Sequence, residues 1–319
     1  MSNYSQFTGG KPTNIAMFFP SSASWTVPYT GKYRVSALAG GGSGGAAKTG
    51  TTGGAASGGA GGGFVEKEIT LVAADVLTFV IGAGGAGVTV STDTASSGNP
   101  GGDTTVVCAA RSLSLTAGCG RAGTATRTNE TTVPGGVGGT ATGGDINSVG
   151  GAGGAAKHLT NGAEAGGGGA AGSPYGTGGA GGAASGSSAF VGAGGGGGIR
   201  EAGGSVTTTG NGAGGWQTNL AMGAAATGFE SASDPFRTLY GYTASTPGPG
   251  SGAVGDASAG VAPGFLGGGG GRATAGSSTA TPPTVPFGGG SGGAASSNAT
   301  ANATSARGGN GLVVIERIG

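Results

Sequence analysis

A three-residue spacing of small residues is the strongest constraint that this sequence places on its own fold. The positions one residue further along the chain, which form the next register, carry larger side chains, such as Lys48 and Ser57. A period of three is the period of the polyproline II helix, which rises about 3.1 Å per residue and has no internal hydrogen bonds. One bare face per turn lets neighbouring backbones approach closely and bond to each other. From position 41 onward, every third residue is Gly41, Gly44, Ala47, Gly50, Gly53, Ala56, Gly59 and Gly62.

The spacing returns twice, first as Gly135, Gly138, Ala141, Gly144, Asn147, Gly150, Gly153 and Ala156, then as Gly166, Gly169, Gly172, Tyr175, Gly178 and Gly181. With 84 Gly among 319 residues, a disordered chain is the first alternative. Ordering a residue costs about 1–2 kcal/mol, and a hydrogen bond returns a net of about 0.5–1.5 kcal/mol. A lone helix is therefore unstable, whereas a bundle in which each helix bonds to several neighbours balances the cost. Collagen needs a strict repeat and much proline, but this repeat breaks and the chain has 13 Pro.

Three patches are rich in β-branched and aromatic residues and are predicted to form strands: 24–38, 64–81 and 311–318. Because they lie far apart in the sequence, we expect them to pair into one small sheet that brings both ends of the chain together. The fold class predicted is mostly β and irregular: a small β-sheet base plus a bundle of packed glycine-rich helices of the polyproline II type. Residues 39–63 and 82–310 supply these helices and their variable loops, and residues 18–319 form a single domain.

Segments of different composition separate the glycine runs and are predicted to be turns: 88–100, 119–134, 157–164, 216–249 and 272–287. The segment 216–249 holds Arg237 and five of the 18 aromatic residues, namely Trp216, Phe229, Phe236, Tyr240 and Tyr242. Aromatic residues and arginine dominate binding hot spots, and Trp and Tyr also stack on sugars. The alternative is that these rings pack on one another and close the end of the bundle.

Composition argues against several functions. A net charge of +1 with 8% charged residues gives no basic surface for nucleic acid or anionic lipid. The sequence contains no run of 18 apolar residues, which a membrane-spanning helix would need, so no membrane insertion is expected. Residues 1–10 lack the features of a signal peptide, and we expect synthesis in a cytosol. Cys108 and Cys119 could form a short-range disulfide, although so few cysteines favour two isolated thiols.

Catalytic patterns are also missing. The acidic residues are scattered singly, without the paired setting of a hydrolase. His158, the one histidine, has no nearby partner for a metal site or a nucleophile, and it is predicted to be a loop residue that contacts a receptor if it lies at a tip. Residues 82–87 fit the dinucleotide-binding pattern, but the Val88-Thr89-Val90 that follows does not begin a helix. We predict no enzymatic activity, no cofactor and no metal.

The order of several short phrases carries a resemblance to a known family. Met17-Phe18-Phe19 and Ser24-Trp25-Thr26-Val27-Pro28 come before a strand that ends in Gly40-Gly41-Gly42. Later come Leu77-Thr78-Phe79-Val80-Ile81-Gly82, Gly101-Gly102-Asp103-Thr104-Thr105-Val106 and, at the end, Gly311-Leu312-Val313-Val314-Ile315-Glu316. Over residues 18–319 this succession resembles the glycine-rich domain of bacteriophage tail fibres and tail-tip adhesins. It departs from that family in that Ala, Ser and Thr dilute the glycine runs.

The resemblance implies polyglycine II helices that carry variable distal loops, and a location in the virion, at the end of a tail fibre. In related adhesins such loops bind bacterial surface proteins or glycans. The candidate receptor contacts in this chain are Trp216, Phe229, Phe236, Arg237, Tyr240, Tyr242 and His158. Residues 1–17 match no known pattern and are predicted to attach the chain to a neighbouring tail protein. Whether the chain is a homotrimer or a monomer stays open.

A purely architectural virion component without receptor contact is the main alternative function, although a spacer has no need of a long aromatic loop. An ice-binding protein would show a regular face of one repeated residue, and an exported cell-wall protein would carry a signal peptide. This sequence shows irregular loops and lacks the features of a signal peptide.

Overall fold

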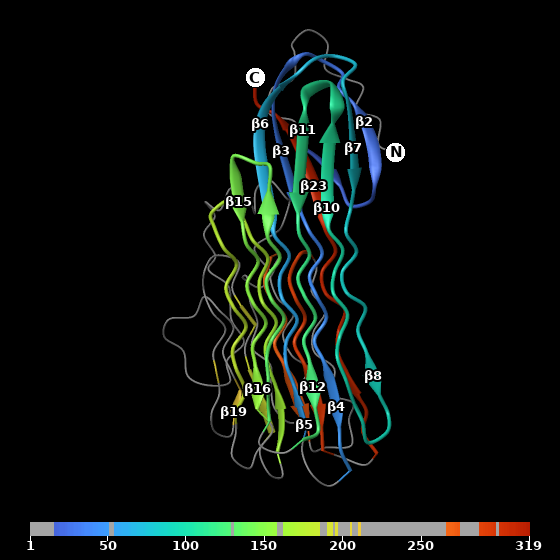
Figure 1. Ribbon diagram of the computed structural model, residues 1–319, viewed down its shortest axis with the longest axis vertical. Coiled ribbons are helices and arrows are strands. Elements are labelled where there is room, and N and C mark those ends of the chain that lie inside the picture. Colours follow the sequence, from blue (N-terminus) through green and yellow to red (C-terminus); the bar gives the residue numbers. More distant parts are fainter. Residues whose placement is uncertain are drawn as a thin grey trace.

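The computed structural model describes residues 16–50, 54–128, 131–157, 162–185, 190–193, 195–196, 205, 210–211, 266–274, 287–297 and 300–319. These residues are mostly β, as the sequence predicts, and they form several small sheets; their one helical element is a 3₁₀ turn, Ala109–Arg111. Figure 1 shows an elongated molecule with a strand-rich base at one end, where both labelled ends of the chain lie. Glycine-rich segments run side by side from the base to the opposite end, which we call the tip.

The first sheet of the base joins the three patches that the sequence predicts to pair. Its order is β1 (Ala16–Phe19), β23 (Leu312–Arg317), β3 (Gly31–Leu38), β6 (Phe64–Leu71) and β15 (Ile146–Ser148), and every pair is antiparallel. Ala16 and Met17 belong to β1, so the base begins two residues before the predicted boundary of the attachment segment. Residues 1–15 lie outside the described residues.

A second sheet corrects the expectation of one small sheet. Its order is β14 (Ala141–Thr142), β11 (Leu113–Ala117), β10 (Thr104–Cys108), β7 (Val76–Val80) and β2 (Ala23–Thr26). The β10–β11 hairpin lies within 82–310, where we expect glycine-rich helices and loops. Buried and exposed residues alternate along β7, β10 and β11, and a single sheet would leave these apolar side chains in water.

The core of the base lies between the two sheets. It buries side chains from both, and ring contacts join them: Phe19 to Phe79, with centroids 4.7 Å apart, and Trp25 to Tyr33, with centroids 5.8 Å apart. Burial of this apolar surface is the main drive for forming the base. The buried residues are Val27, Tyr33, Val35, Ala37, Ala39, Val65, Leu71, Leu77, Phe79, Val106, Cys108, Leu113, Leu115, Ala117, Val313 and Ile315.

Segment 57–63 shows how the glycine-rich part is held together. Its N–H groups bond to three neighbouring segments in turn, and each neighbour recurs every third residue. Residues 57, 60 and 63 donate to the carbonyls of 124, 121 and 118; residues 58 and 61 donate to those of 154 and 151; residues 59 and 62 donate to those of 291 and 288. The donor–acceptor distances are 2.7–3.0 Å. The three-residue period read from the sequence therefore recurs in the hydrogen bonds.

The carbonyls of the same segment accept from three further neighbours. Those of residues 57, 60 and 63 accept from the N–H groups of 45, 42 and 39; those of 58 and 61 from 136 and 139; those of 59 and 62 from 169 and 172. Segment 57–63 thus has six neighbours, and each of its backbone N–H and C=O groups is paired. This pairing satisfies the requirement that buried backbone groups find partners.

Close approach explains the bare register. A Cβ added at Gly59 would lie 2.3 Å from the carbonyl oxygen of Gly42, and a Cβ added at Gly62 would lie 2.4 Å from that of Ala39. No side chain fits at such distances, so only glycine permits this packing.

Buried serines show how the lattice accommodates residues other than glycine. The Ser291 hydroxyl accepts from the Gly44 N–H at 2.9 Å and donates to the Ala306 carbonyl at 2.6 Å. The Ser57 hydroxyl donates to the Pro134 carbonyl at 2.7 Å and accepts from the Thr124 N–H at 2.7 Å. These hydroxyls take over bonds that backbone groups make elsewhere, so serine dilutes the glycine without leaving polar groups unpaired.

Short strands and alanine replace the pure glycine packing at the tip. Small clusters of alanine, with Val90 and Val133, fill the spaces between the strands. Two sheets have the orders β12-β5-β17-β18-β19 and β20-β21-β4-β9, and two pairs are β13-β16 and β22-β8. The strands are β4 (Ala46–Lys48), β5 (Gly54–Ala56), β8 (Thr89–Val90), β9 (Ala95–Ser96), β12 (Ala125–Thr126), β13 (Thr132–Val133), β16 (Ala156–Lys157), β17 (Ala163–Ala165), β18 (Phe190–Gly192), β19 (Gly210–Asn211), β20 (Arg272–Thr274), β21 (Ala294–Ser296) and β22 (Ala303–Thr304).

Candidate binding surface

The residues that the sequence singles out for receptor binding lie outside the described residues. They are Trp216, Phe229, Phe236, Arg237, Tyr240, Tyr242 and His158. The described chain stops at Asn211, in β19 near the tip, and resumes at Leu266. Leu266 packs with Leu38 and Phe64, on the side of the base next to the bundle. The receptor-binding role of these residues stays a prediction.

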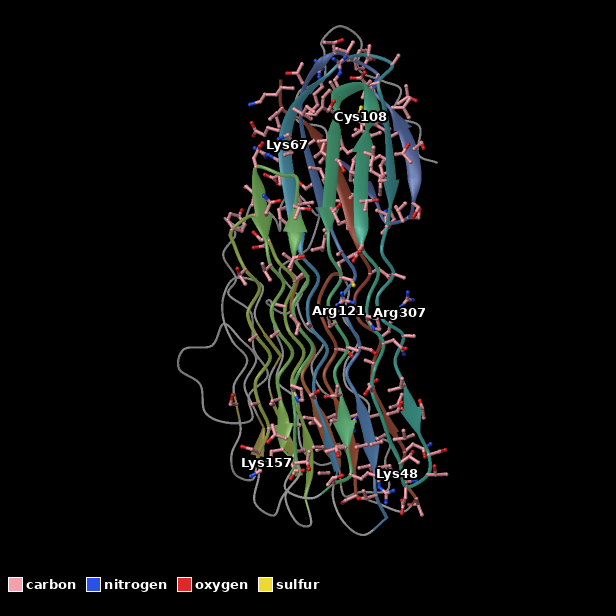
Figure 2. The ribbon with its side chains drawn as sticks, viewed as in Figure 1. Lys48, Lys67, Cys108, Arg121, Lys157 and Arg307 are labelled. Atoms are coloured by element: carbon pink, nitrogen blue, oxygen red, sulfur yellow. The ribbon has the colours of Figure 1, made fainter. Side chains whose placement is uncertain are left out.

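The tip is the end of the molecule that carries β4, β8, β12, β16 and β21, and it lies opposite the base (Figure 1). Figure 2 places the labelled Lys48 and Lys157 at this end, and Lys67 and Cys108 in the base. Of the predicted turn 88–100, residues 91–94 form a turn between β8 and β9, whereas Gly98 and Asn99 bond to Gly123 and Ser43 within the bundle. The predicted turn 157–164 is described only at Lys157 and at 162–164. The predicted turn 119–134 is shorter than expected, because its first residues bond within the bundle, as Arg121 does to Val137.

The turn at 91–94, between β8 and β9, is held from two sides. Lys48 is only 3% exposed, and its Nζ donates to the Ser91 carbonyl at 2.7 Å while its backbone N–H donates to the Thr94 carbonyl at 2.9 Å. From the neighbouring turn, Nη1 of Arg127 donates to the Asp93 carbonyl. The buried lysine of this site was missed by sequence reasoning, because Lys48 looks like any solvated cation in a glycine-rich run.

Hydroxyl groups dominate the side chains exposed at the described part of the tip. Ten exposed residues of the described tip lie at positions 89, 91–94, 97, 127, 128, 132 and 300. Two of them are charged, Asp93 and Arg127, and they have opposite signs. None of the ten is aromatic or large and apolar. The other eight carry hydroxyls: Thr89, Ser91, Thr92, Thr94, Ser97, Thr128, Thr132 and Thr300.

The outer face of the first sheet, by contrast, is charged. Arg34 on β3 contacts three carboxylates, Glu66 at 3.5 Å, Glu68 at 3.0 Å and Glu316 at 3.1 Å, and so ties the middle and C-terminal strands to β3. Burial raises the pKa of Glu66, against the lowering effects of the Ser36 hydroxyl and of Arg34.

Two other acidic side chains of this face have lowered pKa values. Hydrogen bonds from Lys32 and Arg34 lower the pKa of Glu68. The Glu68 N–H and Lys67 lower the pKa of Asp145, whose carboxylate accepts from both groups. These contacts stabilise strand pairing in the base.

Both cysteines are free thiols, which answers the question that the sequence leaves open. Cys108 is buried in the core of the base, and Cys119 is half-buried at the start of the bundle. Burial and a hydrogen bond with Asp103 raise the pKa of the Cys119 thiol.

The described residues contain neither a candidate metal-binding group nor a candidate membrane-spanning helix. Within that part of the chain, no three His, Cys, Asp or Glu side chains are grouped to hold a metal ion. The same residues include no helix long and apolar enough to span a membrane.

Comparison with protein-family models gave no match, and comparison with curated protein sequences gave none either.

Proposed function

We propose that this chain is a bacteriophage tail-fibre or tail-tip protein that recognises a bacterial surface receptor through loops carried on a rigid scaffold. The observation that carries the proposal is the placement of the described ends of the chain. Ala16 and Gly319 lie in the base, at one end of an elongated molecule, and the tip turns lie at the other end (Figure 1). A chain anchored through its N-terminal segment would hold its tip away from the anchor, toward a host cell.

The scaffold in this proposal is a bundle of polyglycine II helices. The hydrogen bonds of segment 57–63 support that assignment, because neighbours recur every three residues and each backbone group is paired to an adjacent segment. Polyproline II geometry has this period and leaves its N–H and C=O groups free to bond outward. An ordinary sheet would bond each strand to two neighbours rather than six.

Rigidity is what such a scaffold contributes to recognition. Binding costs free energy when loops must be ordered, so loops fixed beforehand bind more tightly for the same contacts. The turn at 91–94 is fixed by Lys48 and Arg127 before any ligand arrives. A bundle with few charged residues also gives little non-specific attraction to nucleic acid or membranes.

The partners in this proposal are a bacterial surface receptor, protein or glycan, and a neighbouring tail protein attached through residues 1–17. The protein is made in the bacterial cytoplasm and assembled into the virion tail. No enzymatic step and no cofactor is part of the proposal. Several copies on one virion, as a homotrimer or as separate monomers, would raise the avidity of a weak contact.

Binding of the fluorescently tagged protein to a panel of bacterial strains tests this function. The control has residues 216–242 replaced by a Gly/Ser linker and an unchanged melting temperature. Saturable binding to particular strains supports the proposal. Binding lost in the control places the contact in the aromatic segment, whereas binding that survives leaves the other tip loops as the site. Binding to no strain, including the host of the phage that encodes the protein, would favour the purely architectural alternative.

A further inference from the structure

We propose that the ligand of the tip is a neutral, hydroxyl-rich polysaccharide of the bacterial surface, bound through serine and threonine hydroxyls around the turn at 91–94. This inference rests on the proposed function and narrows its receptor to one chemical class. The decisive residues are Ser91, Thr92 and Thr128, and all three are exposed.

The hydroxyls of these three residues are available to a ligand. Their backbone groups are used: the Ser91 carbonyl accepts from Lys48, the Thr92 carbonyl from the Thr94 N–H at 2.6 Å, and the Thr128 N–H donates to the Thr126 hydroxyl at 3.0 Å. Their side chains make no hydrogen bond to other residues that the structure describes. A hydroxyl both donates and accepts, which matches the hydroxyls of a sugar in either role.

Charged glycans and phosphates fit this surface poorly. Recognition of carboxylate or phosphate relies on Arg and Lys. Lys48 is buried with its Nζ on the Ser91 carbonyl, and the guanidinium of Arg127 is held by the Asp93 carbonyl. Both cations at this turn are therefore bonded to backbone carbonyls, and the exposed Asp93 carboxylate beside them disfavours an anionic ligand.

A protein receptor fits less well for a different reason. Protein–protein hot spots are rich in Trp, Tyr and Arg, and Ser and Thr are under-represented in them. Eight of the ten exposed side chains of the described tip carry hydroxyls. Hydrogen bonds exchanged with water give only a modest net gain, so binding per copy is weak and depends on a repeated ligand and several copies. A surface polysaccharide is such a repeated ligand.

The experiment begins with a strain that the wild-type protein binds. Its cells are treated with periodate, which oxidises vicinal diols of sugars, or with protease, which removes surface proteins. Wild-type protein, presented in many copies on beads, is then assayed on both sets of cells and on polysaccharide extracted from the strain. We expect periodate to abolish binding, protease to leave it unchanged, and the extract to be bound.

Two matched triple variants locate the contact. The tip variant is Ser91→Ala, Thr92→Val and Thr128→Val, and it removes three hydroxyls with little change of shape. The control removes the same groups from exposed positions of the base, Ser114→Ala, Thr26→Val and Thr142→Val. The tip variant should lower bead binding to the extract at least tenfold, and the control should bind like wild type.

The possible outcomes separate the two proposals. Binding that protease abolishes and periodate spares would overturn the polysaccharide inference in favour of a protein receptor, and the recognition function would stand. Periodate-sensitive binding that is equal in the two variants would overturn the role of the tip hydroxyls. Failure to bind any strain would count against the recognition function itself.

Discussion

Replacing Gly61 with alanine is a direct test of the lattice, because two neighbouring segments are hydrogen-bonded to this residue and a third leaves no room for a side chain. Its N–H donates to the Gly151 carbonyl and its carbonyl accepts from the Gly139 N–H, each at 2.9 Å. A methyl group at this position would lie 1.9 Å from the Ala170 carbonyl oxygen. Carbon and oxygen need roughly 3.3 Å between them, so segments 57–63 and 166–172 must separate by over about 1 Å.

The expected cost follows from that separation. Two bonds join these segments nearby, from the N–H groups of Gly169 and Gly172 to the carbonyls of Gly59 and Gly62, and each is 2.9 Å long. Losing both costs about 1–3 kcal/mol, and the overpacking costs a further 1–3 kcal/mol or so. Alanine recovers about 0.4–1 kcal/mol by restricting the unfolded chain, which leaves a net loss of about 2–5 kcal/mol.

Thermal unfolding followed by circular dichroism measures this loss. A chain of 319 residues has an unfolding entropy of about 0.7 kcal/mol/K near its melting point, so Gly61→Ala should lower the melting temperature by roughly 3–8 °C. The matched control is Gly50→Ala, where the added methyl would meet only the end of the Asp93 side chain, at 3.1 Å. That variant should shift the melting temperature by about 1 °C or less. Equal melting temperatures for the two variants would refute the close packing of segment 57–63.

Three further predictions concern charge, thiols and a buried hydroxyl. The raised pKa of Glu66 means that its ionised form opposes folding, so Glu66→Gln should leave stability at pH 7 unchanged or higher. The lowered pKa of Asp145 means that its ionised form favours folding, so Asp145→Asn should lower stability at pH 7. In urea unfolding, the Asp145→Asn difference should fade as the pH drops below 3.8 through the lowered pKa, and persistence of that difference in acid would contradict the assignment. Thiol titration of the unreduced, unfolded protein should count two free thiols, and a count of zero would indicate a disulfide. In the folded protein, the half-buried Cys119 should react before the buried Cys108. Ser57→Ala should cost about 1–3 kcal/mol in urea unfolding, because the Thr124 N–H loses its partner, whereas a change near zero would mean that water replaces the hydroxyl.

Much of the architecture could be predicted from the sequence because it follows from local chemistry. The three-residue spacing around Gly41–Gly62 predicts segments with one bare face, and the hydrogen bonds of 57–63 have that period. The patches 24–38, 64–81 and 311–318 predict strands, and β3, β6 and β23 do pair. Steric size and side-chain branching act within a few residues, so these features can be read without knowledge of the rest of the fold.

The candidate site was less accessible to sequence reasoning. The aromatic segment 216–249 attracts attention because its composition is unusual, and the structure does not describe it. The hydroxyl surface at 91–94 and 128 has an ordinary turn composition. What distinguishes it is the buried Lys48 beneath it, which comes from β4, and Arg127 beside it, which follows β12.

The sequence by itself determined that glycine-rich segments must pack side by side and that strands near both ends must meet. Only the tertiary structure decided which segments are neighbours, that the base has two sheets and which end of the molecule carries the tip. The physical reason is that backbone hydrogen bonds are alike in every glycine run, so a run does not encode its partners. The order is set where side chains differ: by the apolar faces of β7, β10 and β11 in the base, and by the alanine clusters at the tip.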